Sequence, residues 1–404
     1  MDLTADHLRS PAHRNLCTDC GVSRMADPSA CGTACQFIAP DYPAQEQQVH
    51  GRVAGTDGDE AFFGVTQAMY RAAMVQPRDG AQWTGITTSL AASLLRAGTV
   101  DAVLACVPDA ADRWAPVPAI LTDPDDLVRA RGMRMGYAPL LAALEPAVAA
   151  GHRRIAVVGI PCQVFALRAL EKRLGLDLYV IGTPCSDNTT TAHFHDFLGR
   201  LTDRPGDVTY LEFRADFHVE LRFADGTKRL IPFLKLPISD LPDDFFPLTC
   251  RTCVDYTNRL ADITVGYMAG EGDQWLIVRN ARGAQMLAGL GDAVRLAAPG
   301  DKGKRQGSVT GFIANTRRAA GGMPLRRMPD WLRPVMGWLM PRIGPKGLEF
   351  ARARVEMKAA ETILHLRRHA PARMKTMIPD HVWRLAAPYD LPPAPGEQKT
   401  PTDD

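Results

Sequence analysis

The sequence predicts an α/β fold with a mostly parallel sheet and helices on both faces of that sheet. Three observations support this expectation. From about residue 84, apolar segments of strand length alternate with segments of helical periodicity. Between 208 and 234, three short segments alternate apolar with polar residues, which indicates an antiparallel β insert. The first 40 residues carry four cysteines and little periodicity, so they form a cysteine-rich N-terminal segment.

The elements follow from spacing and end signals. The segment 84–97 has apolar residues at helical spacing and stops at Gly98. Further helices are expected at 139–150, 162–174, 189–201, 281–290 and 347–368, and apolar strands at 101–107, 154–160, 178–181, 263–267 and 275–279. The insert has strands at 208–213, 218–223 and 228–233, with a hairpin turn at Asp225-Gly226. Residues 299–330 carry basic clusters and look loop-rich, and the tail is rich in proline and charge.

These patterns divide the chain into five units. They are a cysteine-rich segment (1–60), an α/β core (61–205), an antiparallel insert with a second cysteine motif that completes the core (206–298), a basic helical region (299–390) and a disordered tail (391–404).

Composition excludes several classes of protein. The 404 residues are 46% hydrophobic and 23% charged, as in ordinary globular proteins. A net charge of +2 argues against a nucleic-acid partner. The chain opens without an apolar signal sequence, which predicts a cytoplasmic protein. No uncharged apolar run reaches membrane-spanning length, although the apolar, basic segment 331–343 leaves peripheral membrane contact open.

Eight of the nine cysteines form two candidate sets of four. In a reducing compartment such cysteines favour metal or redox chemistry over disulfides. Cys17, Cys20, Cys31 and Cys35 have the spacing of a four-thiolate site, which suits either structural zinc or a 4Fe–4S cluster. Cys106 lies inside an apolar strand and is most simply a small core residue.

The second set is inferred from placement. Two near copies of one turn, with a glycine, one further residue, a proline and a cysteine, follow two apolar strands and end at Cys162 and Cys185. If these strands are neighbours, both sulfurs reach one edge of the sheet, where α/β proteins bind ligands. Cys250 and Cys253, a C-x-x-C pair, would complete four thiolates. The alternative is a pair of inert buried cysteines.

A turn at Gly80–Gly85 leads directly into the helix at 84–97. A glycine-flanked turn at a helix N-terminus is a phosphate-binding element, and this one also carries a glutamine and a tryptophan that suit an isoalloxazine ring. An ordinary helix start with a buried tryptophan is the alternative. No nicotinamide or ATP fingerprint is present.

Taken together, several stretches resemble the β-subunit family of deazaflavin-dependent hydrogenases and dehydrogenases. The similarity is closest to the chlorophyll branch, which includes 7-hydroxymethyl chlorophyll a reductase and the ferredoxin-dependent 3,8-divinyl chlorophyllide 8-vinyl reductase. The stretches are 49–52, 80–86, 162–168, 182–188, 253–258, 260–268, 278–280 and 344–352, in order along the chain.

The resemblance implies FAD, two 4Fe–4S clusters and reduced ferredoxin as electron donor. The implied cluster ligands are Cys17, Cys20, Cys31, Cys35, Cys162, Cys185, Cys250 and Cys253. The implied flavin contacts are Gln82, Trp83, Thr84, Gly85, Thr87 and Asn188. One departure concerns the N-terminal motif, in which relatives place a cysteine where this chain has Ser23. Either Cys31 takes over as ligand, or the first cluster has an unusual ligand or an open iron.

The implied reaction is reduction of the 8-vinyl group of 3,8-divinyl chlorophyllide or protochlorophyllide to ethyl. Electrons would pass singly from ferredoxin through the clusters and leave FAD as a hydride. The candidate proton donors are Tyr256, Asp255 and His218, and the sequence does not choose among them. Reduction of a 7-hydroxymethyl group is the alternative within the family. Outside it, the alternatives are an electron-transfer subunit without its own pigment substrate and a zinc-bound structural module.

Overall fold

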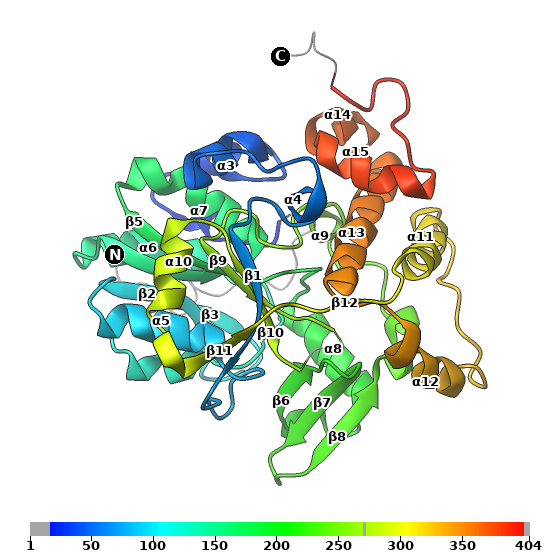
Figure 1. Cartoon of the computed structure of the whole chain (residues 1–404), viewed down its shortest axis with the longest axis horizontal. Coiled ribbons are helices and arrows are strands. Elements are labelled where there is room, and N and C mark those ends of the chain that lie inside the picture. The colour runs from blue at the N-terminus through cyan, green and yellow to red at the C-terminus, as the bar shows by residue number, and fades with distance from the viewer. Residues whose placement is uncertain (1–16, 270–271, 400–404) are drawn as a thin grey trace.

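The computed structural model describes residues 17–269 and 272–399 of the chain. Its centre is an eight-stranded sheet in the order β11-β1-β10-β9-β5-β4-β2-β3 (Figure 1). The strands are β1 (Ala68–Met74), β2 (Ala102–Pro108), β3 (Pro116–Leu121), β4 (Arg154–Gly159), β5 (Asp177–Gly182), β9 (Ile263–Gly266), β10 (Gln274–Val278) and β11 (Val294–Ala297).

The middle of the sheet is parallel and its two sides are antiparallel. Strands β2, β4, β5 and β9 pair in parallel, while β3, β10, β1 and β11 pair antiparallel with their neighbours. The register between β4 and β5 sets Gly159 opposite Gly182. The two repeated turns therefore leave the sheet side by side, as the sequence required for their cysteines to meet.

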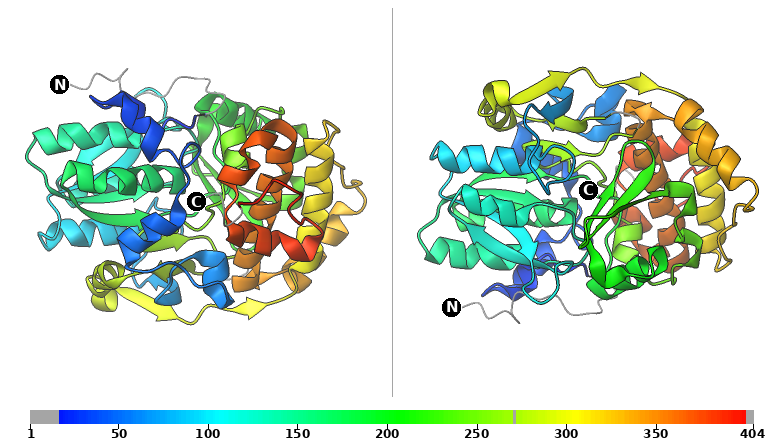
Figure 2. Two further views of the ribbon diagram at one scale, coloured as in Figure 1. Left: turned by 90° about the horizontal axis from the view of Figure 1, so that it is seen from above. Right: turned by 90° about the horizontal axis from the view of Figure 1, so that it is seen from below.

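Helices cover both faces of the sheet, which confirms the predicted α/β class (Figure 2). One face packs against α7 (Pro161–Leu174) and the short 3-10 helix η4 (Leu140–Ala143) with α6 (Leu144–Ala149). The other face packs against α5 (Ile86–Arg96) and α10 (Ala281–Ala288). The consecutive β4 residues Ile155 and Ala156 belong to the cores on opposite faces of the sheet, because successive side chains of a strand point to opposite faces.

The antiparallel insert is confirmed as a separate three-stranded sheet. It consists of β6 (Val208–Phe213), β7 (His218–Phe223) and β8 (Lys228–Pro232), in that order. Gly226 adopts a positive φ of 82° at the β7–β8 hairpin, where a glycine costs no steric strain. The insert packs against α8 (Thr191–Leu201), so both lie below the main sheet in Figure 1.

The described residues differ from two expectations about the C-terminal part. Residues 299–330 are not mainly loops, because α11 (Gln306–Ala320) buries Val309, Ile313 and Ala320 at helical spacing. The tail was expected to be disordered from 391. In its described part, Leu391 is buried and Glu397 forms an ion pair with Arg367 at 2.7 Å.

The remaining helices complete the molecule. They are α2 (Cys31–Ala34), α3 (Tyr42–His50), α4 (Gly58–Phe63), α9 (Leu248–Arg251), α12 (Arg333–Ile343), α13 (Leu348–His369), α14 (Met374–Met377) and α15 (Asp380–Ala386), and a two-stranded ribbon pairs β12 (Asp301–Lys302) with β13 (Lys346–Gly347). None of the helices in the described residues combines the length and apolarity needed to cross a membrane. The proposed division into five units stays a prediction.

Candidate functional site

The four N-terminal cysteines lie near one another. Burial, together with the nearby thiols of Cys17, Cys35 and Cys31, raises the pKa of the Cys20 thiol to about 12. The charges of neighbouring groups shift a pKa in this way only at close range. Ser23 lies in the short 3-10 helix η1 (Val22–Arg24) and is exposed to solvent. The structure therefore places Cys31, and not Ser23, with the other three thiols.

The N-terminal loop is fixed to the sheet layer at Gly21. This residue has a φ of 105°, and a Cβ atom on it would lie only 2.5 Å from the backbone nitrogen of Ala142. The backbone N–H of Leu141 donates to the carbonyl of Cys20 at 2.9 Å. Only glycine permits this approach, so the position of the first thiol set depends on it.

The second set of cysteines also comes together, from three parts of the chain. Burial raises the pKa values of Cys162, Cys185 and Cys250 well above the usual range, and burial raises that of Cys253 to about 11. The thiols of Cys250 and Cys253 add to the shift of Cys162, and those of Cys162 and Cys253 add to the shift of Cys185. The four thiols disfavour one another's ionisation, so they are neutral when nothing is bound. A bound cation would stabilise their thiolate forms.

The two sets lie next to each other. The hydroxyl of Thr18, between Cys17 and Cys20, is 3.6 Å from Cys162 Sγ. The amide of Gln36, beside Cys35, donates to Cys253 Sγ at 3.6 Å. Thr18 and Gln36, which neighbour cysteines of the first set in the sequence, thus contact sulfurs of the second set. Metal centres held by the two sets would therefore lie close together.

The spacing of the ligand side chains bears on the kind of metal. Among the described residues, no three His, Cys, Asp or Glu side chains converge closely enough to hold a single metal ion. A structural zinc ion needs four ligands at about 2.0–2.3 Å from one point. In an iron–sulfur cluster each thiolate binds a different iron, so the sulfurs stand farther apart. A set of four cysteines is compatible with either kind of group.

A buried lysine from α13 faces the second set. Burial alone disfavours its charge, but Asp187 and Glu361 hold the pKa of Lys358 above its usual value, with Nζ at 2.7 and 2.8 Å from their carboxylates. The same charge lowers the pKa of Cys253, against the effect of burial. Thr362, one turn further along α13, donates to the carbonyl of Cys253 at 3.1 Å. Sequence spacing gave no sign that α13 would cover this site.

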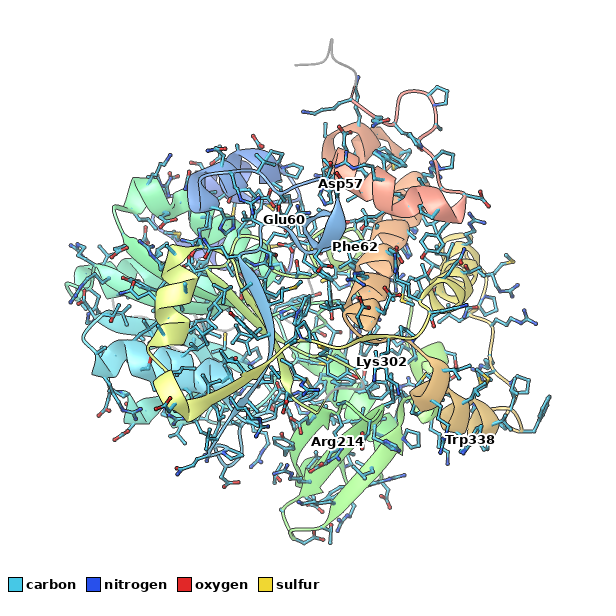
Figure 3. All side chains as sticks on the ribbon, viewed as in Figure 1. Asp57, Glu60, Phe62, Arg214, Lys302 and Trp338 are labelled. Atoms are coloured by element: carbon cyan, nitrogen blue, oxygen red, sulfur yellow. The ribbon has the colours of Figure 1, made fainter. Side chains whose placement is uncertain are left out.

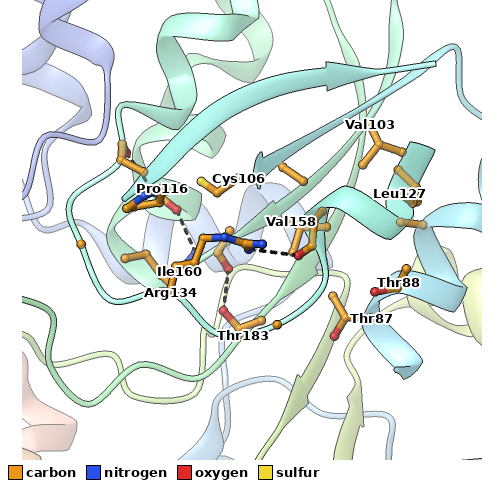
Figure 4. A pocket seen from close by; sticks show the side chains of 18 of the residues that line it. Thr87, Thr88, Val103, Cys106, Pro116, Leu127, Arg134, Val158, Ile160 and Thr183 are labelled. Carbon is orange, nitrogen blue, oxygen red and sulfur yellow. Dashed lines mark hydrogen bonds between the residues drawn. The ribbon is translucent and has the colours of Figure 1, made fainter. Parts of the chain in front are cut away.

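A cavity of about 180 Å³ opens at the carboxyl ends of β2, β4 and β5 (Figure 4). Thr87 and Thr88 in the first turn of α5 line one side. The first N–H groups of a helix lack acceptors within it, and the N-cap residue Gly85 supplies no side chain to α5, although the N–H of Ile86 donates to Gln274 Oε1 at 3.4 Å. The other donors of this turn and the positive end of the helix dipole favour an anionic group in the cavity.

Arg134 supplies a second feature that favours an anion. Its guanidinium donates to the backbone carbonyls of Ala130, Arg129 and Arg131 at 3.4, 3.2 and 2.8 Å. Its Nε is buried without a hydrogen-bond partner, and no carboxylate in the described part of the chain forms an ion pair with it. Burial lowers the pKa of Arg134. Figure 4 shows the side chain reaching into the cavity near Cys106, Ile160 and Thr183. A phosphate would satisfy both the charge and the free donor.

The sequence analysis missed Arg134. It lies in an irregular segment between β3 and η4, where periodicity gives no signal. The only available hint was its place between Gly132 and Gly136, two further cavity residues. Cys106 was predicted to be only a core residue, which is incomplete, because it lines the cavity beside Arg134.

The predicted flavin residues divide into two groups. Thr87 and Asn188 line the cavity. The others, Gln82, Trp83, Thr84 and Gly85, form the tight turn before α5 and do not line it.

That turn is held by its own contacts. The Thr84 hydroxyl accepts from the backbone N–H of Met74 at 3.0 Å. The Trp83 ring packs edge-on against Tyr267 at 5.5 Å, and its backbone N–H donates to Glu212. These four residues therefore position the start of α5, and a direct flavin contact from them stays a prediction.

None of the three predicted proton donors lines the cavity. Asp255 is buried and accepts the backbone N–H of Arg259 at 3.0 Å. The carbonyl of Tyr256 accepts from the N–H of Cys185 at 3.0 Å. His218 lies on β7 in the insert, 3.3 Å from Asp216. The structure does not bring the three together, and their catalytic roles stay predictions.

The cavity and the second thiol set share the two repeated turns. Gly159 and Ile160 line the cavity, and Cys162 follows directly in α7. Thr183 lines it from the second turn, two residues before Cys185. Asn258 ties the turns together, because its amide donates to the carbonyls of Gly159 and Thr183 at 2.8 and 3.3 Å. An anionic cofactor in the cavity would thus lie within a few residues of the thiols.

Comparison with known families gives two matches along this chain. A model described as coenzyme F420 hydrogenase/dehydrogenase, beta subunit N-term, matches residues 69–145, and the corresponding C-terminus model matches residues 152–300. These segments include the cavity and the second thiol set.

Two sequence relatives and one solved structure are similar to this chain. The chain is 36% identical to an uncharacterized protein of Nostoc sp. (strain PCC 7120) over 95% of this chain and 96% of that protein. It is also 36% identical to 7-hydroxymethyl chlorophyll a reductase of Oryza sativa subsp. japonica, over 93% of this chain and 83% of the rice protein. The F420-reducing [NiFe] hydrogenase complex of Methanosarcina barkeri contains a chain with the same fold, with a TM-score of 0.51 and 20% identity over 59% of this chain and 84% of that one.

Proposed function

The chain belongs to the coenzyme F420 hydrogenase/dehydrogenase β-subunit family, in the branch that includes 7-hydroxymethyl chlorophyll a reductase, and we propose that it is an iron–sulfur flavoprotein reductase of chlorophyll-type tetrapyrroles. The proposed reaction is reduction of the 8-vinyl group of 3,8-divinyl chlorophyllide or protochlorophyllide to ethyl, with reduced ferredoxin as electron donor.

One observation carries this proposal: two adjacent sets of four cysteines lie against a cavity with unmet positive charge. We assign one 4Fe–4S cluster to Cys17, Cys20, Cys31 and Cys35, and the other to Cys162, Cys185, Cys250 and Cys253. FAD is the cofactor proposed for the cavity. When bound, clusters supply single-electron transfer and FAD supplies hydride transfer.

The protein's own residues have definable tasks in this proposal. Arg134 and the first turn of α5 would bind the cofactor's phosphates. Lys358 places a positive charge next to the second thiol set, where it offsets the negative charge of four thiolates. Helix α13 covers this set through Thr362, which limits the access of water to it.

The substrate class follows from the relatives. The rice enzyme's name gives a chlorophyll with a 7-hydroxymethyl group as its substrate, and the similarity spans nearly the whole of this chain. Reduction of that group is therefore the second candidate function. We favour the 8-vinyl group because the bacterial relative matches this chain end to end, whereas the rice protein is longer, and because Ser23 departs from the usual cysteine motif.

An anaerobic assay with both pigments distinguishes the candidates. Purified protein, chemically reduced ferredoxin and each pigment are incubated, and the products are identified by mass spectrometry. Reduction of a vinyl group adds two electrons and two protons, which raises the mass by two hydrogens. Reduction of a hydroxymethyl group consumes the same electrons and protons but releases water.

The expected result is conversion of the 8-vinyl compound with the 7-hydroxymethyl compound unchanged. The reverse result would assign the second candidate function. If neither pigment changes while the bound flavin is reduced by ferredoxin, the chain is an electron-transfer subunit and the proposed reaction is wrong.

A further inference from the structure

Helix α12 and the segment before it carry several exposed apolar side chains. Trp331 is 75% exposed, Val335 53% and Trp338 59%. No residue of α12 is buried, so the protein core does not account for its apolar sequence. Isolated exposed apolar residues are common, but a cluster that includes two tryptophans indicates an interaction surface.

Most of the exposed residues share one side of the helix, while Ile343 at its last turn, 61% exposed, lies apart from them. Trp331, Val335, Trp338 and Arg342 follow one another at intervals of four, three and four residues, which is the spacing of a single helical face. Leu332, Met336, Leu339 and Met340 lie on the opposite side and are half-buried, where α12 packs near the 3-10 helix η6 (Phe233–Lys235). In Figure 3, Trp338 lies at the outer end of the molecule and points away from the sheet.

Charge around this face is mainly positive, although Arg333 pairs with Asp330 at 3.3 Å and Arg327 pairs with Asp240. Residues 323–346 contain five basic residues and one acidic residue, Asp330. The basic residues are Arg326, Arg327, Arg333, Arg342 and Lys346. The Arg342 guanidinium lies 4.2 Å from the centre of the Trp338 ring and donates to the carbonyl of Trp338 at 2.6 Å. A guanidinium above an aromatic ring is a favourable cation–π contact, and tryptophan is enriched where one end of the ring is apolar and the other wet.

We propose that this face, Trp331 to Arg342, binds the surface of an anionic lipid bilayer. Tryptophans and a valine on one side of a helix, with arginines around them, match a helix that lies in the membrane interface. The tryptophans would enter the headgroup region, and the arginines would contact lipid phosphates. The charge complementarity favours anionic over neutral lipid, and the outward position of α12 allows a flat surface to reach it.

Vesicle flotation with the full-length protein tests the proposal. The probes are vesicles of phosphatidylcholine alone and of phosphatidylcholine with phosphatidylglycerol, at low and high salt. The wild type should float with the anionic vesicles and release them at high salt. The variant Trp331→Ser/Trp338→Ser should bind about tenfold more weakly, and Arg326→Ser should lose about fivefold in affinity for anionic vesicles alone.

The matched control is Leu230→Ser, which removes a 51% exposed leucine from β8 in the insert. It should float like the wild type. A second readout follows the tryptophans, because Trp114, Trp275 and Trp383 are buried while Trp331 and Trp338 are exposed. Vesicles with brominated acyl chains should quench emission of the wild type but not of the double variant.

Three results would overturn the proposal. If the wild-type protein floats with neither kind of vesicle, the membrane proposal is wrong. A dimer in light scattering that the double variant converts to monomer would show that a second copy covers the face. Retention on immobilised acidic ferredoxin without vesicle binding would show a protein partner instead.

Discussion

Arg134 is a half-buried charge with one fully buried donor, Nε, that lacks a partner. Its guanidinium has only backbone carbonyls as partners, and one of its donors has none. Leaving a buried charged group unpaired is costly, so such a group is kept where a ligand completes it. The nature of the cavity's occupant is therefore determined more by this residue than by the turn at Gln82–Gly85.

Replacing Arg134 with glutamine should weaken flavin binding at least about tenfold, because a charge-assisted hydrogen bond contributes about 1.5–3 kcal/mol. The flavin retained per chain after desalting measures the effect. Arg129→Gln, an exposed arginine of the same segment, is the control and should retain the wild-type amount. Equal flavin content in the two variants would contradict the role of Arg134.

His50 connects the N-terminal segment to the sheet. Its Nε2 lies 2.8 Å from the carbonyl of Arg259, and its Nδ1 lies 3.3 Å from the amide of Asn280. Burial lowers its pKa to about 4 from an unfolded value near 6.5. The neutral ring thus stabilises the fold fully above about pH 6.5, and this contribution is lost as the pH falls towards 4.

The variant His50→Gln keeps one donor and one acceptor but does not titrate. Thermal unfolding of the wild type should become more acid-sensitive than that of the variant between pH 6.5 and 4, by up to about 1.4 kcal/mol per pH unit. Scanning calorimetry of both proteins across this range measures it. Parallel pH profiles would show that His50 is protonated without cost in the folded state.

The two repeated turns depend on glycines that face each other across β4 and β5. A Cβ atom at Gly182 would lie 2.6 Å from the Asn258 side chain and 2.7 Å from Ala261. Asn258 in turn donates to carbonyls of both turns. The glycine therefore permits the contact that aligns the cavity with Cys162 and Cys185.

Substituting Gly182 with alanine should displace Asn258 and destabilise the protein by about 1–3 kcal/mol. Iron content should also fall, although the residue binds no metal. Gly199→Ala, on the open side of α8, is the control, because its Cβ would meet nothing within 4 Å. Iron analysis and thermal unfolding report the two effects, and an unchanged iron content would mean that the turns tolerate the shift.

Some elements were predictable and others were not, for identifiable reasons. The apolar strands β4 and β5 and helix α7 have unambiguous periodicity and clear ends. Strand β3 is not among the strands expected from the sequence; it contains Pro116 and Pro118 and lies at the sheet edge, where proline is tolerated. Helix α11 buries only a narrow stripe between glycines and charges, so its pattern was too weak to detect.

Across the whole molecule, the sequence identified the cysteines of the candidate site but not the residues that surround them. The N-terminal cysteines were recognised as a set from their spacing, and the second set was inferred from the placement of its cysteines after two strands and in a C-x-x-C pair. Two basic residues set the electrostatic environment of the site. Arg134 reaches it from an irregular segment, and Lys358 reaches it from a helix about 100 residues beyond the last cysteine. Only folding brings them to the site, so no local pattern could identify them.

The cysteines also connect distant parts of the chain. Loss of bound metal should therefore loosen the cysteine-bearing segments more than the rest of the protein. Removing iron by oxidation and chelation should expose the N-terminal segment and speed tryptic cleavage at Arg24, which pairs with Asp19 in the folded protein. Cleavage at the exposed Arg229, in the cysteine-free insert, should keep its rate. Mass spectrometry of timed digests measures both sites, and equal acceleration would indicate global unfolding instead.

The central claim is that two iron–sulfur clusters and a flavin lie together in one chain. Purification without oxygen, followed by iron, sulfide and flavin analysis, tests it most directly. The account predicts about eight iron atoms for two 4Fe–4S clusters and one FAD per chain, with Cys106→Ser unchanged in iron. A colourless protein that contains zinc, or no metal, and no flavin would contradict it.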